Sequence, residues 1–236
     1  MRLSRASTRW HVFPDRTEVV ERLAASIAEQ ARHALAARAR YLIVLAGGET
    51  PGALYRLLRD LDTDWSRWEI YFGDERCLSR GDPGRNDTMA GALWLGRVGI
   101  PLAQIHSIPA ELGASVAALR YSKVLADVGR FDTTLLGLGE DGHTASLFPG
   151  QPIGAEVGSP DVLAVHGAPK PPGERVSLTA RRLAAAAHVE LLALGEAKRE
   201  ALHSLREGAD VPITAIVPGA GLDVWVDGAA AGTLSA

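Results

Sequence analysis

The sequence contains very little cysteine, since Cys77 is the only one among 236 residues. A single cysteine excludes an intrachain disulfide framework and fits a reducing compartment, so we expect a cytoplasmic protein. No run of about 18 or more apolar residues occurs, and the sequence therefore predicts no transmembrane helix. The N-terminal residues MRLSRASTR are basic, but no apolar segment follows them. A secretory signal is therefore not expected.

The sequence also lacks a large excess of either charge, because the formal net charge is only −3. An overall charge this small gives no general attraction to nucleic acid or to an anionic membrane, and we expect neither as a partner. Metal-ligand patterns are absent as well: there is no HxxH or CxxC motif, and His143 has no second histidine motif nearby. We therefore expect no metal site. The oligomeric state stays open, and a monomer is compatible with the sequence.

The sequence does contain an alternation of short apolar runs with amphipathic segments. The runs that predict strands are 10–13, 41–47, 68–73, 105–109, 131–139, 161–167, 188–195 and 223–227, the last of them at an edge. Helices are expected from residue 14 onward, over 51–60, 87–96 and 113–128, and after 195. This alternation predicts an α/β fold with a mostly parallel sheet and helices on both faces. Because no repeat or linker interrupts it, we expect a single domain over 1–236 with at most a small inserted subdomain.

Polar segments follow several of the predicted strands directly. They are AGGETP at 46–51, GDER at 73–76, GEDGH at 139–143 and GEAK at 195–198. In an open parallel sheet, the loops after the strand C-termini line the edge where ligands bind. Polar loops that meet at one such edge favour a ligand site over a purely structural role.

Two of these segments, AGGETP and GEAK, and the separate residue Arg175 have features of a phosphate site. Gly47 and Gly48 allow a close backbone approach at a helix start, where N–H groups and the Thr50 hydroxyl can bind a phosphate. The loop is neither a Walker A motif nor GxGxxG, so no nucleotide is implied, and many plain turns also carry two glycines. Lys198 lies in the first turn of a predicted helix, which is unfavourable for a cation unless an anion binds there. Arg175 can supply a bidentate fork for phosphate, although both cations can equally be solvated surface residues.

The remaining two segments bring candidates for catalysis. In GEDGH, His143 can project from a tight turn as a neutral general base near pH 7, with Asp141 nearby. GDER adds Asp74 and Arg76, which on their own can be a local ion pair. A carboxylate would fix the tautomer of His143, and the residues leave open whether Asp141 or Asp74 does so. Ser146 lies in no G-x-S-x-G elbow, which argues against a serine esterase.

Taken together, these segments resemble the glucosamine-6-phosphate isomerase/6-phosphogluconolactonase family, and within it the 6-phosphogluconolactonases. The resemblance covers nearly the whole chain, and it lies in LAGGETP, YFGDER, LLGLGEDGHTASLFPG, APKPPGERVSLT and LLALGEAK, in that order. It implies a Rossmann-like three-layer fold and a cytosolic, cofactor-free hydrolase of the pentose phosphate pathway. Such an enzyme would convert 6-phospho-D-glucono-1,5-lactone, a small sugar-phosphate lactone, to 6-phospho-D-gluconate.

The resemblance also implies roles for particular residues. His143 matches the general base of the family and Arg76 matches an arginine that contacts the substrate. Arg175, Lys198 and the loop 47–50 match the phosphate site. Glu49 departs from the family pattern, in which a small or basic residue is expected at this position. A carboxylate here would repel a phosphate unless its side chain points away.

Two rival functions are weighed against lactone hydrolysis. Glucosamine-6-phosphate deaminase/isomerases usually carry a Glu soon after the histidine, where this chain has TASLFPG, and an Asp-Glu-Tyr type motif where it has GDER. Both differences favour the lactonase. A non-catalytic sugar-phosphate sensor would need an attached helix-turn-helix, for which the segment before the first strand is too short. The pairing of His143 with Asp141 also favours chemistry over sensing.

Overall fold

The computed structural model describes residues 8–216 and 218–232, so residues 1–7 of the basic N-terminal segment lie outside it. A seven-stranded sheet forms the centre of the molecule, with the strand order β1-β10-β9-β6-β2-β3-β5 and parallel pairing between all of its neighbours. Its strands are β1 (Thr8–Phe13), β2 (Tyr41–Leu45), β3 (Trp68–Phe72), β5 (Ile105–His106), β6 (Phe131–Gly137), β9 (Ala186–Ala193) and β10 (Leu222–Asp227). The predicted α/β class is confirmed.

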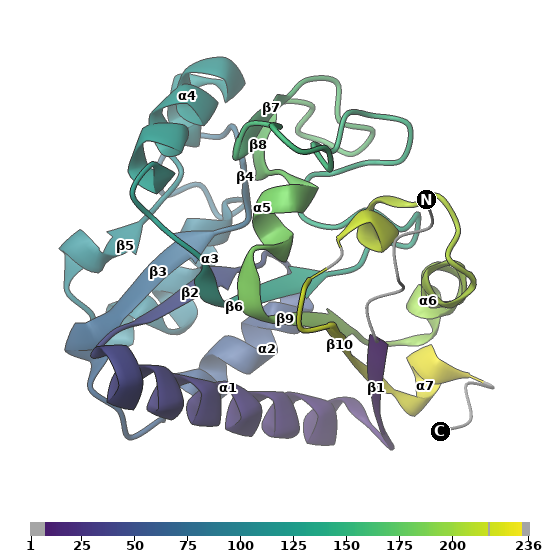
Figure 1. The fold of residues 1–236 in the computed structure, drawn as a ribbon, viewed down its shortest axis with the longest axis horizontal. Coiled ribbons are helices and arrows are strands. Elements are labelled where there is room, and N and C mark those ends of the chain that lie inside the picture. The colour runs from purple at the N-terminus through teal and green to yellow at the C-terminus, as the bar shows by residue number, and fades with distance from the viewer. Residues whose placement is uncertain (1–7, 217, 233–236) are drawn as a thin grey trace.

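Helices cover both faces of this sheet. In Figure 1, α1 and α2 lie below the sheet, while α4 and α5 lie above it. The helices are α1 (Arg16–Arg38), α2 (Glu49–Leu58), α3 (Asn86–Leu93), α4 (Ala114–Leu125), α5 (Ala180–Ala184), α6 (Arg199–Glu207) and α7 (Gly228–Ala231). Short 3-10 turns are η1 (Trp65–Arg67), η2 (Leu95–Arg97), η3 (Leu102–Gln104), η4 (Ala110–Leu112), η5 (Glu196–Lys198) and η6 (Pro212–Ala215). Across the described part of the chain, no helix is both long enough and apolar enough to cross a membrane.

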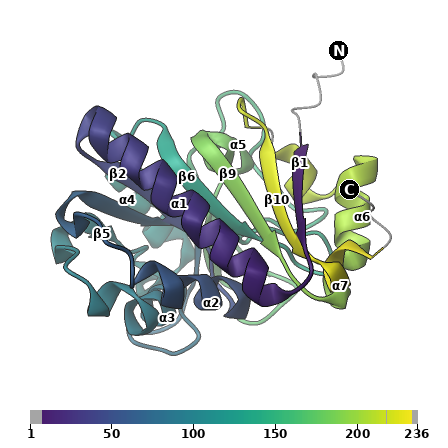
Figure 2. The ribbon, with the colours of Figure 1, turned by 90° about the horizontal axis from the view of Figure 1, so that it is seen from below.

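The longest helix, α1, shows how the sequence determines an element and its packing. The Asp15 carboxylate accepts hydrogen bonds from the backbone N–H groups of Thr17 and Glu18, which caps the first turn. The helix ends where Ala39 adopts a left-handed conformation. Its buried residues recur at helical spacing and include Leu23 and Ile27, which are fully buried. This apolar stripe packs α1 across the face of the sheet, as Figure 2 shows.

A second, smaller sheet lies above the first. It is antiparallel, with the order β4-β8-β7, and consists of β4 (Asp74–Arg76), β7 (Val162–Val165) and β8 (Arg175–Leu178). Gly73 joins the two sheets, because its N–H donates to the carbonyl of Leu45 and its own carbonyl accepts from the N–H of Leu178. This sheet therefore brings the polar residues of GDER and of the segment after the proline-rich loop over the end of the main sheet.

The order of the strands creates a crevice at the carboxyl ends of β2 and β6. From β2 the chain proceeds to β3 and β5 on one side, whereas from β6 it proceeds to β9 and β10 on the other. Loops that leave adjacent strands in opposite directions open a crevice at this switch point. The glycine loop follows β2 and the GEDGH turn follows β6, so the fold places both at that crevice.

Several predicted boundaries were wrong. The strand predicted at 223–227 is interior and not at an edge, because β1 pairs beside it in parallel and takes the edge position. The second helix begins at Glu49 and not at Pro51, with Gly48 as its N-cap. On α4, Tyr121 and Leu125 are buried as expected, but Val124 is 41% exposed because it lies on the solvent side of the helix. Neither β4 nor β8 was predicted as a strand.

Candidate active site

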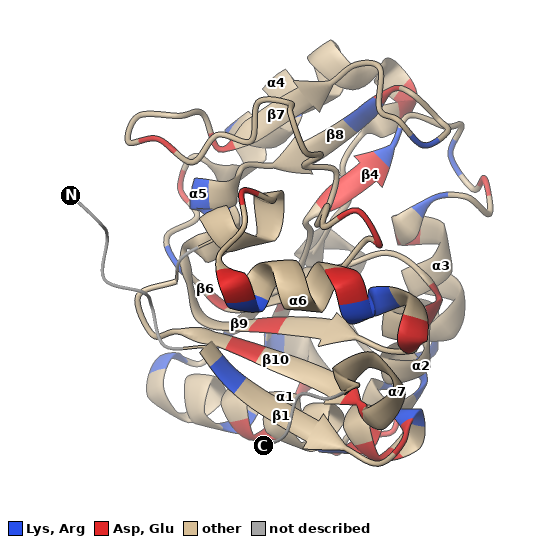
Figure 3. Ribbon diagram, turned by 90° about the vertical axis from the view of Figure 1, so that its right-hand side faces the viewer, with Lys and Arg blue, Asp and Glu red and all other residues tan. Residues whose placement is uncertain are grey.

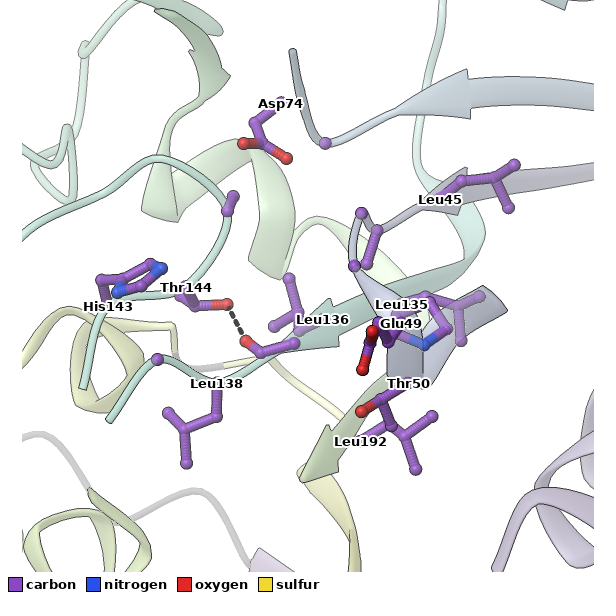
Figure 4. Close-up of a pocket in the computed structure, with 18 of the residues that line it drawn as sticks. Leu45, Glu49, Thr50, Asp74, Leu135, Leu136, Leu138, His143, Thr144 and Leu192 are labelled. Atoms are coloured by element: carbon purple, nitrogen blue, oxygen red, sulfur yellow. Dashed lines mark hydrogen bonds between the residues drawn. The ribbon is translucent and has the colours of Figure 1, made fainter. Parts of the chain in front are cut away.

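A pocket of about 410 Å³ opens at the crevice between β2 and β6. Figure 4 shows it with His143 on one side, Glu49 and Thr50 on the other, and Asp74 above them. The predicted site residues that line this pocket are Gly47, Gly48, Thr50, Asp74, Arg76, His143, Arg175 and Lys198. Asp141 does not line the pocket but contacts His143 directly. The fold therefore brings together every residue that the sequence proposed for the site.

The GEDGH turn is closed so that His143 projects over it. The N–H of Gly139 donates to the carbonyl of His143 at 2.7 Å, and Gly142 adopts a φ of +81° that favours glycine. A Cβ atom at Gly139 would lie 1.9 Å from Nδ1 of His143 and 2.5 Å from Oδ1 of Asp141. Only glycine at 139 lets both side chains pack over the backbone. This explains why an apolar strand is followed by glycines, carboxylates and a histidine in one turn.

The contacts of His143 suit a neutral imidazole. Its Nδ1 lies 2.5 Å from Oδ1 of Asp141, so Nδ1 carries the proton of the neutral imidazole and donates a hydrogen bond to the carboxylate. Burial lowers the pKa of His143 below its usual value, while Asp141 raises it and Lys170 lowers it further. The ring also packs against Phe148, with 4.9 Å between the ring centroids. No described residue hydrogen-bonds Nε2, which leaves this atom able to accept a proton.

Asp74 has different partners from those of Asp141. Its Oδ2 accepts a hydrogen bond of 2.6 Å from the hydroxyl of Ser146, and its Oδ1 accepts one of 3.0 Å from the side-chain amide of Asn86. The choice that the sequence left open is therefore decided geometrically, because Asp141 and not Asp74 contacts the imidazole of His143. Asp74 is 5% exposed and forms part of the pocket wall.

Two arginines lie side by side in the smaller sheet, where Arg76 of β4 is paired in register with Arg175 of the neighbouring strand β8. Figure 3 shows the acidic and basic segments of these neighbouring strands. The guanidinium of Arg175 donates to the carbonyls of Lys170, Pro171 and Pro172 at 3.1–3.2 Å. Burial lowers the pKa of Arg175, and the charge of Arg76 lowers it further. Arg175 thus gives the pocket positive charge, but the loop carbonyls occupy the fork that the sequence analysis assigned to phosphate.

The glycine loop, whose Glu49 and Thr50 lie opposite His143 in Figure 4, lines the pocket together with Lys198. The loop ends in α2, whose N-cap Gly48 has a φ of +103° and supplies no side-chain cap, so the first N–H groups of the helix remain available. Lys198 is half-buried, and no described residue pairs with it. Glu49 lines the same pocket. Because Glu49 is exposed and lines the pocket, this departure from the family pattern lies at the site itself.

Sequence reasoning missed two cations of the pocket, Arg16 and Lys170. Arg16 opens α1 immediately after β1, and Lys170 lies in the proline-rich loop after β7. The signal that could have found them is the one used for the other loops, since both follow the carboxyl end of a strand. The ammonium of Lys170 lies 3.9 Å from Oδ1 of Asp141, the same oxygen that contacts His143.

The side chains of the pocket do not form a metal-binding set. Within residues 8–216 and 218–232, no group of three or more His, Cys, Asp and Glu side chains is placed to hold a metal ion. The charged groups that do converge are mainly cationic, and they suit an anionic organic ligand.

Comparison with known proteins places these observations in a family. The sequence profile described as glucosamine-6-phosphate isomerases/6-phosphogluconolactonase matches residues 14–225. The chain belongs to this family. The match spans the glycine loop, the GEDGH turn and Lys198, so all the residues of the pocket lie within it.

Individual relatives agree with the family assignment. The chain is 36% identical over 227 residues to the 6-phosphogluconolactonase of Mycobacterium leprae, covering 89% of each chain. It is 38% identical over 217 residues to that of Streptomyces coelicolor, covering 84% of this chain and 82% of the relative. A crystal structure of 6-phosphogluconolactonase from Thermotoga maritima superposes with a TM-score of 0.86 at 24% identity, over 94% of this chain and 100% of the other. That structure supports the three-layer fold.

Proposed function

We propose that this chain hydrolyses 6-phospho-D-glucono-1,5-lactone to 6-phospho-D-gluconate, the lactonase step of the oxidative pentose phosphate pathway. One observation carries the proposal: His143, held by Asp141, lines the same pocket as the glycine loop and Lys198. A base at one end and a phosphate site at the other suit a phosphorylated sugar whose C1 and C6 lie at opposite ends. The names of the relatives in Mycobacterium leprae and Streptomyces coelicolor support this substrate.

The reaction begins with proton abstraction from water. The Nε2 atom of neutral His143 accepts the proton while the water oxygen attacks C1 of the lactone. Asp141 keeps the proton of the imidazole on Nδ1 and stabilises the imidazolium that forms. A lactone is an activated ester, so a positioned general base is sufficient for the attack. Because burial lowers the pKa of His143, its imidazole is neutral at physiological pH and its Nε2 can accept a proton.

Negative charge then develops on the former carbonyl oxygen of C1. Arg76 lines the pocket, and its Nε is buried without a hydrogen-bond partner among the described residues. The guanidinium of Arg76, or N–H groups of the neighbouring loops, would meet the developing charge. The tetrahedral intermediate collapses by breaking the bond between C1 and the ring oxygen. The ring oxygen receives the proton from the imidazolium, which regenerates neutral His143 and leaves a carboxylic acid that ionises.

Binding of the phosphate positions C1 of the substrate for this attack by water. The N–H groups of the glycine loop and of the first turn of α2 are free of a side-chain cap and can bind an anion, and the Thr50 hydroxyl adds a donor. Lys198 and Arg16 supply positive charge with no carboxylate paired to either in the described chain. Arg175, which also lines the pocket, adds to its positive potential. Anchoring at C6 converts the water attack at C1 into a reaction of a bound, oriented substrate.

A direct assay tests the proposal. The lactone is generated in situ by glucose-6-phosphate dehydrogenase, and its disappearance is followed with and without the protein, because the lactone also opens spontaneously. Hydrolysis well above the spontaneous rate is expected. A rate equal to the spontaneous one would contradict the proposal, and release of ammonia from glucosamine 6-phosphate would favour the deaminase instead.

A further inference from the structure

The Asp74 carboxylate is held from two sides by residues that are distant in sequence. The hydroxyl of Ser146 donates to Oδ2 at 2.6 Å, and the amide of Asn86 donates to Oδ1 at 3.0 Å. The same amide nitrogen also donates to the main-chain carbonyl of Asp74 at 2.9 Å. Ser146 is 1% exposed and Asn86 is 2% exposed, so water cannot easily replace either donor. The carboxylate therefore has a fixed orientation.

Each of these donors is itself held in place. The N–H of Ser146 donates to the hydroxyl of Ser177, and a guanidinium N–H of Arg175 points at the hydroxyl oxygen of Ser146 from 3.4 Å. With Arg175 donating on one side, the hydroxyl hydrogen of Ser146 is directed to Asp74 on the other. This also excludes Ser146 as a nucleophile, because its hydroxyl is buried, does not line the pocket and contacts a carboxylate and not the imidazole.

Asn86 is fixed from three directions. Its N–H donates to the buried carboxylate of Glu75 at 2.8 Å, which caps the start of α3. Its side-chain nitrogen donates to Asp74, and its side-chain oxygen lies against the glycine loop, where a Cβ atom at Gly47 would be only 1.9 Å away. The opposite orientation of the amide would place its oxygen against two acceptors of Asp74, the carboxylate Oδ1 and the main-chain carbonyl oxygen. The contacts thus fix the amide and set the distance between Asp74 and the glycine loop.

The two bonds leave Asp74 with acceptor capacity toward the pocket. A carboxylate has about four lone-pair sites, and one on each oxygen is used by Ser146 or Asn86. Asp74 lines the pocket and is not the partner of His143. Sugar hydroxyls are the donors that a bound hexose lactone presents to such an oxygen. We infer that Ser146 and Asn86 are positioning residues that orient Asp74 to accept a hydrogen bond from a hydroxyl of the bound sugar.

This inference rests on the proposed function and is tested by a double-mutant cycle. Ser146→Ala is combined with Asp74→Ala, and both kcat/KM for the lactone and the affinity for 6-phosphogluconate are measured. In the wild-type background, we expect Ser146→Ala to lower kcat/KM by about 5- to 50-fold, since a hydrogen bond to a charged group is lost. In the Asp74→Ala background, the same change should alter kcat/KM and affinity by less than about 2-fold, because the group that it positions is gone.

Controls separate positioning from damage to the fold. Ser122→Ala removes a hydroxyl that bonds only to the carbonyl of Ala118 within α4, and it should leave kcat/KM unchanged. Thermal unfolding checks each variant, and Asn86→Ala repeats the cycle if Ser146→Ala does not fold. Equal losses in both backgrounds, or no loss in a folded Ser146→Ala protein, would overturn the inference. If the wild-type protein lacked lactonase activity, the proposed function would fail, and the cycle would then be decided on 6-phosphogluconate affinity alone.

Discussion

The Nδ1 atom of His143 lies 2.5 Å from Oδ1 of Asp141, two residues earlier in the same turn. The other candidate carboxylate, Asp74, is bonded to Ser146, which is 72 residues away in the sequence. The imidazole is therefore oriented by a local partner within one turn, whereas the part of the pocket wall that Asp74 forms depends on a long-range contact. The predicted consequences for catalysis, binding and stability differ accordingly.

Replacing His143 tests the general base. His143→Ala should lower kcat by about 10²- to 10⁴-fold while KM changes little, because proton transfer occurs in the transition state and not in substrate binding. His33→Ala is a suitable control, since His33 is an exposed histidine on α1 that contacts Glu29 and does not line the pocket. A decrease in kcat of less than about 3-fold would show that another group removes the proton.

The bond to Asp141 predicts a shift in the pH profile. Burial lowers the pKa of His143 below 6.5, and Asp141 opposes this shift by stabilising the imidazolium. In the wild type, kcat/KM should therefore rise with pH through a midpoint below 6.5 and then level off, since the neutral imidazole is the active form. Asp141→Asn removes the stabilising charge, so the midpoint should move to still lower pH and the plateau should fall. The exposed Glu140→Gln, in the same turn, should leave the midpoint where it is; a midpoint that moves upward in Asp141→Asn would contradict this role.

Lys198 should act on binding of the phosphate. Lys198→Ala is expected to lower kcat/KM for the phosphorylated lactone by about 10- to 100-fold, because a hydrogen bond to a charged group contributes about 1.5–3 kcal/mol. Hydrolysis of glucono-1,5-lactone, which lacks the phosphate, should change little. Lys123→Ala on the exposed face of α4 serves as the matched control. An equal loss on both lactones would exclude a phosphate-specific role.

The sequence predicted the main sheet well because its buried parallel strands are continuous apolar runs, as in 41–45. It did not predict β4 and β8, since strands that begin at Asp74 and Arg175 read as polar loops until the second sheet is known. The glycine loop, Asp74, His143 and Lys198 meet at one pocket because each follows the carboxyl end of a strand of the main sheet, whereas Arg175 reaches it from the start of β8. The occupied fork of Arg175 could not be predicted, because it depends on the path of the loop that holds Lys170.

Glu49 should weaken binding of an anion. Its side chain is exposed and lines the pocket beside the glycine loop, so a bound phosphate meets a like charge there. Glu49→Gln keeps the size of the side chain and removes the charge, and it should lower KM for the phosphorylated lactone by about 2- to 5-fold, as expected for an exposed charge in water. The difference should shrink at high ionic strength. A higher KM in Glu49→Gln would show instead that the carboxylate accepts a hydrogen bond from the sugar.

Replacing two glycines by alanine, each of which follows an alanine in the sequence, should change stability in opposite directions. A Cβ atom at Gly47 would lie 1.9 Å from the buried side-chain oxygen of Asn86, so Gly47→Ala must displace the glycine loop or the amide that holds Asp74. Overpacking of this kind costs about 1–3 kcal/mol, and both Tm and kcat/KM should fall.

Gly91 lies inside α3 with nothing within 4 Å of the new methyl group. Gly91→Ala should therefore raise the free energy of unfolding by about 0.5–1 kcal/mol through helix propensity and leave kcat/KM unchanged. Urea titration of both variants measures the free energies, and a Gly47→Ala protein as stable and active as the wild type would contradict the tight contact with Asn86.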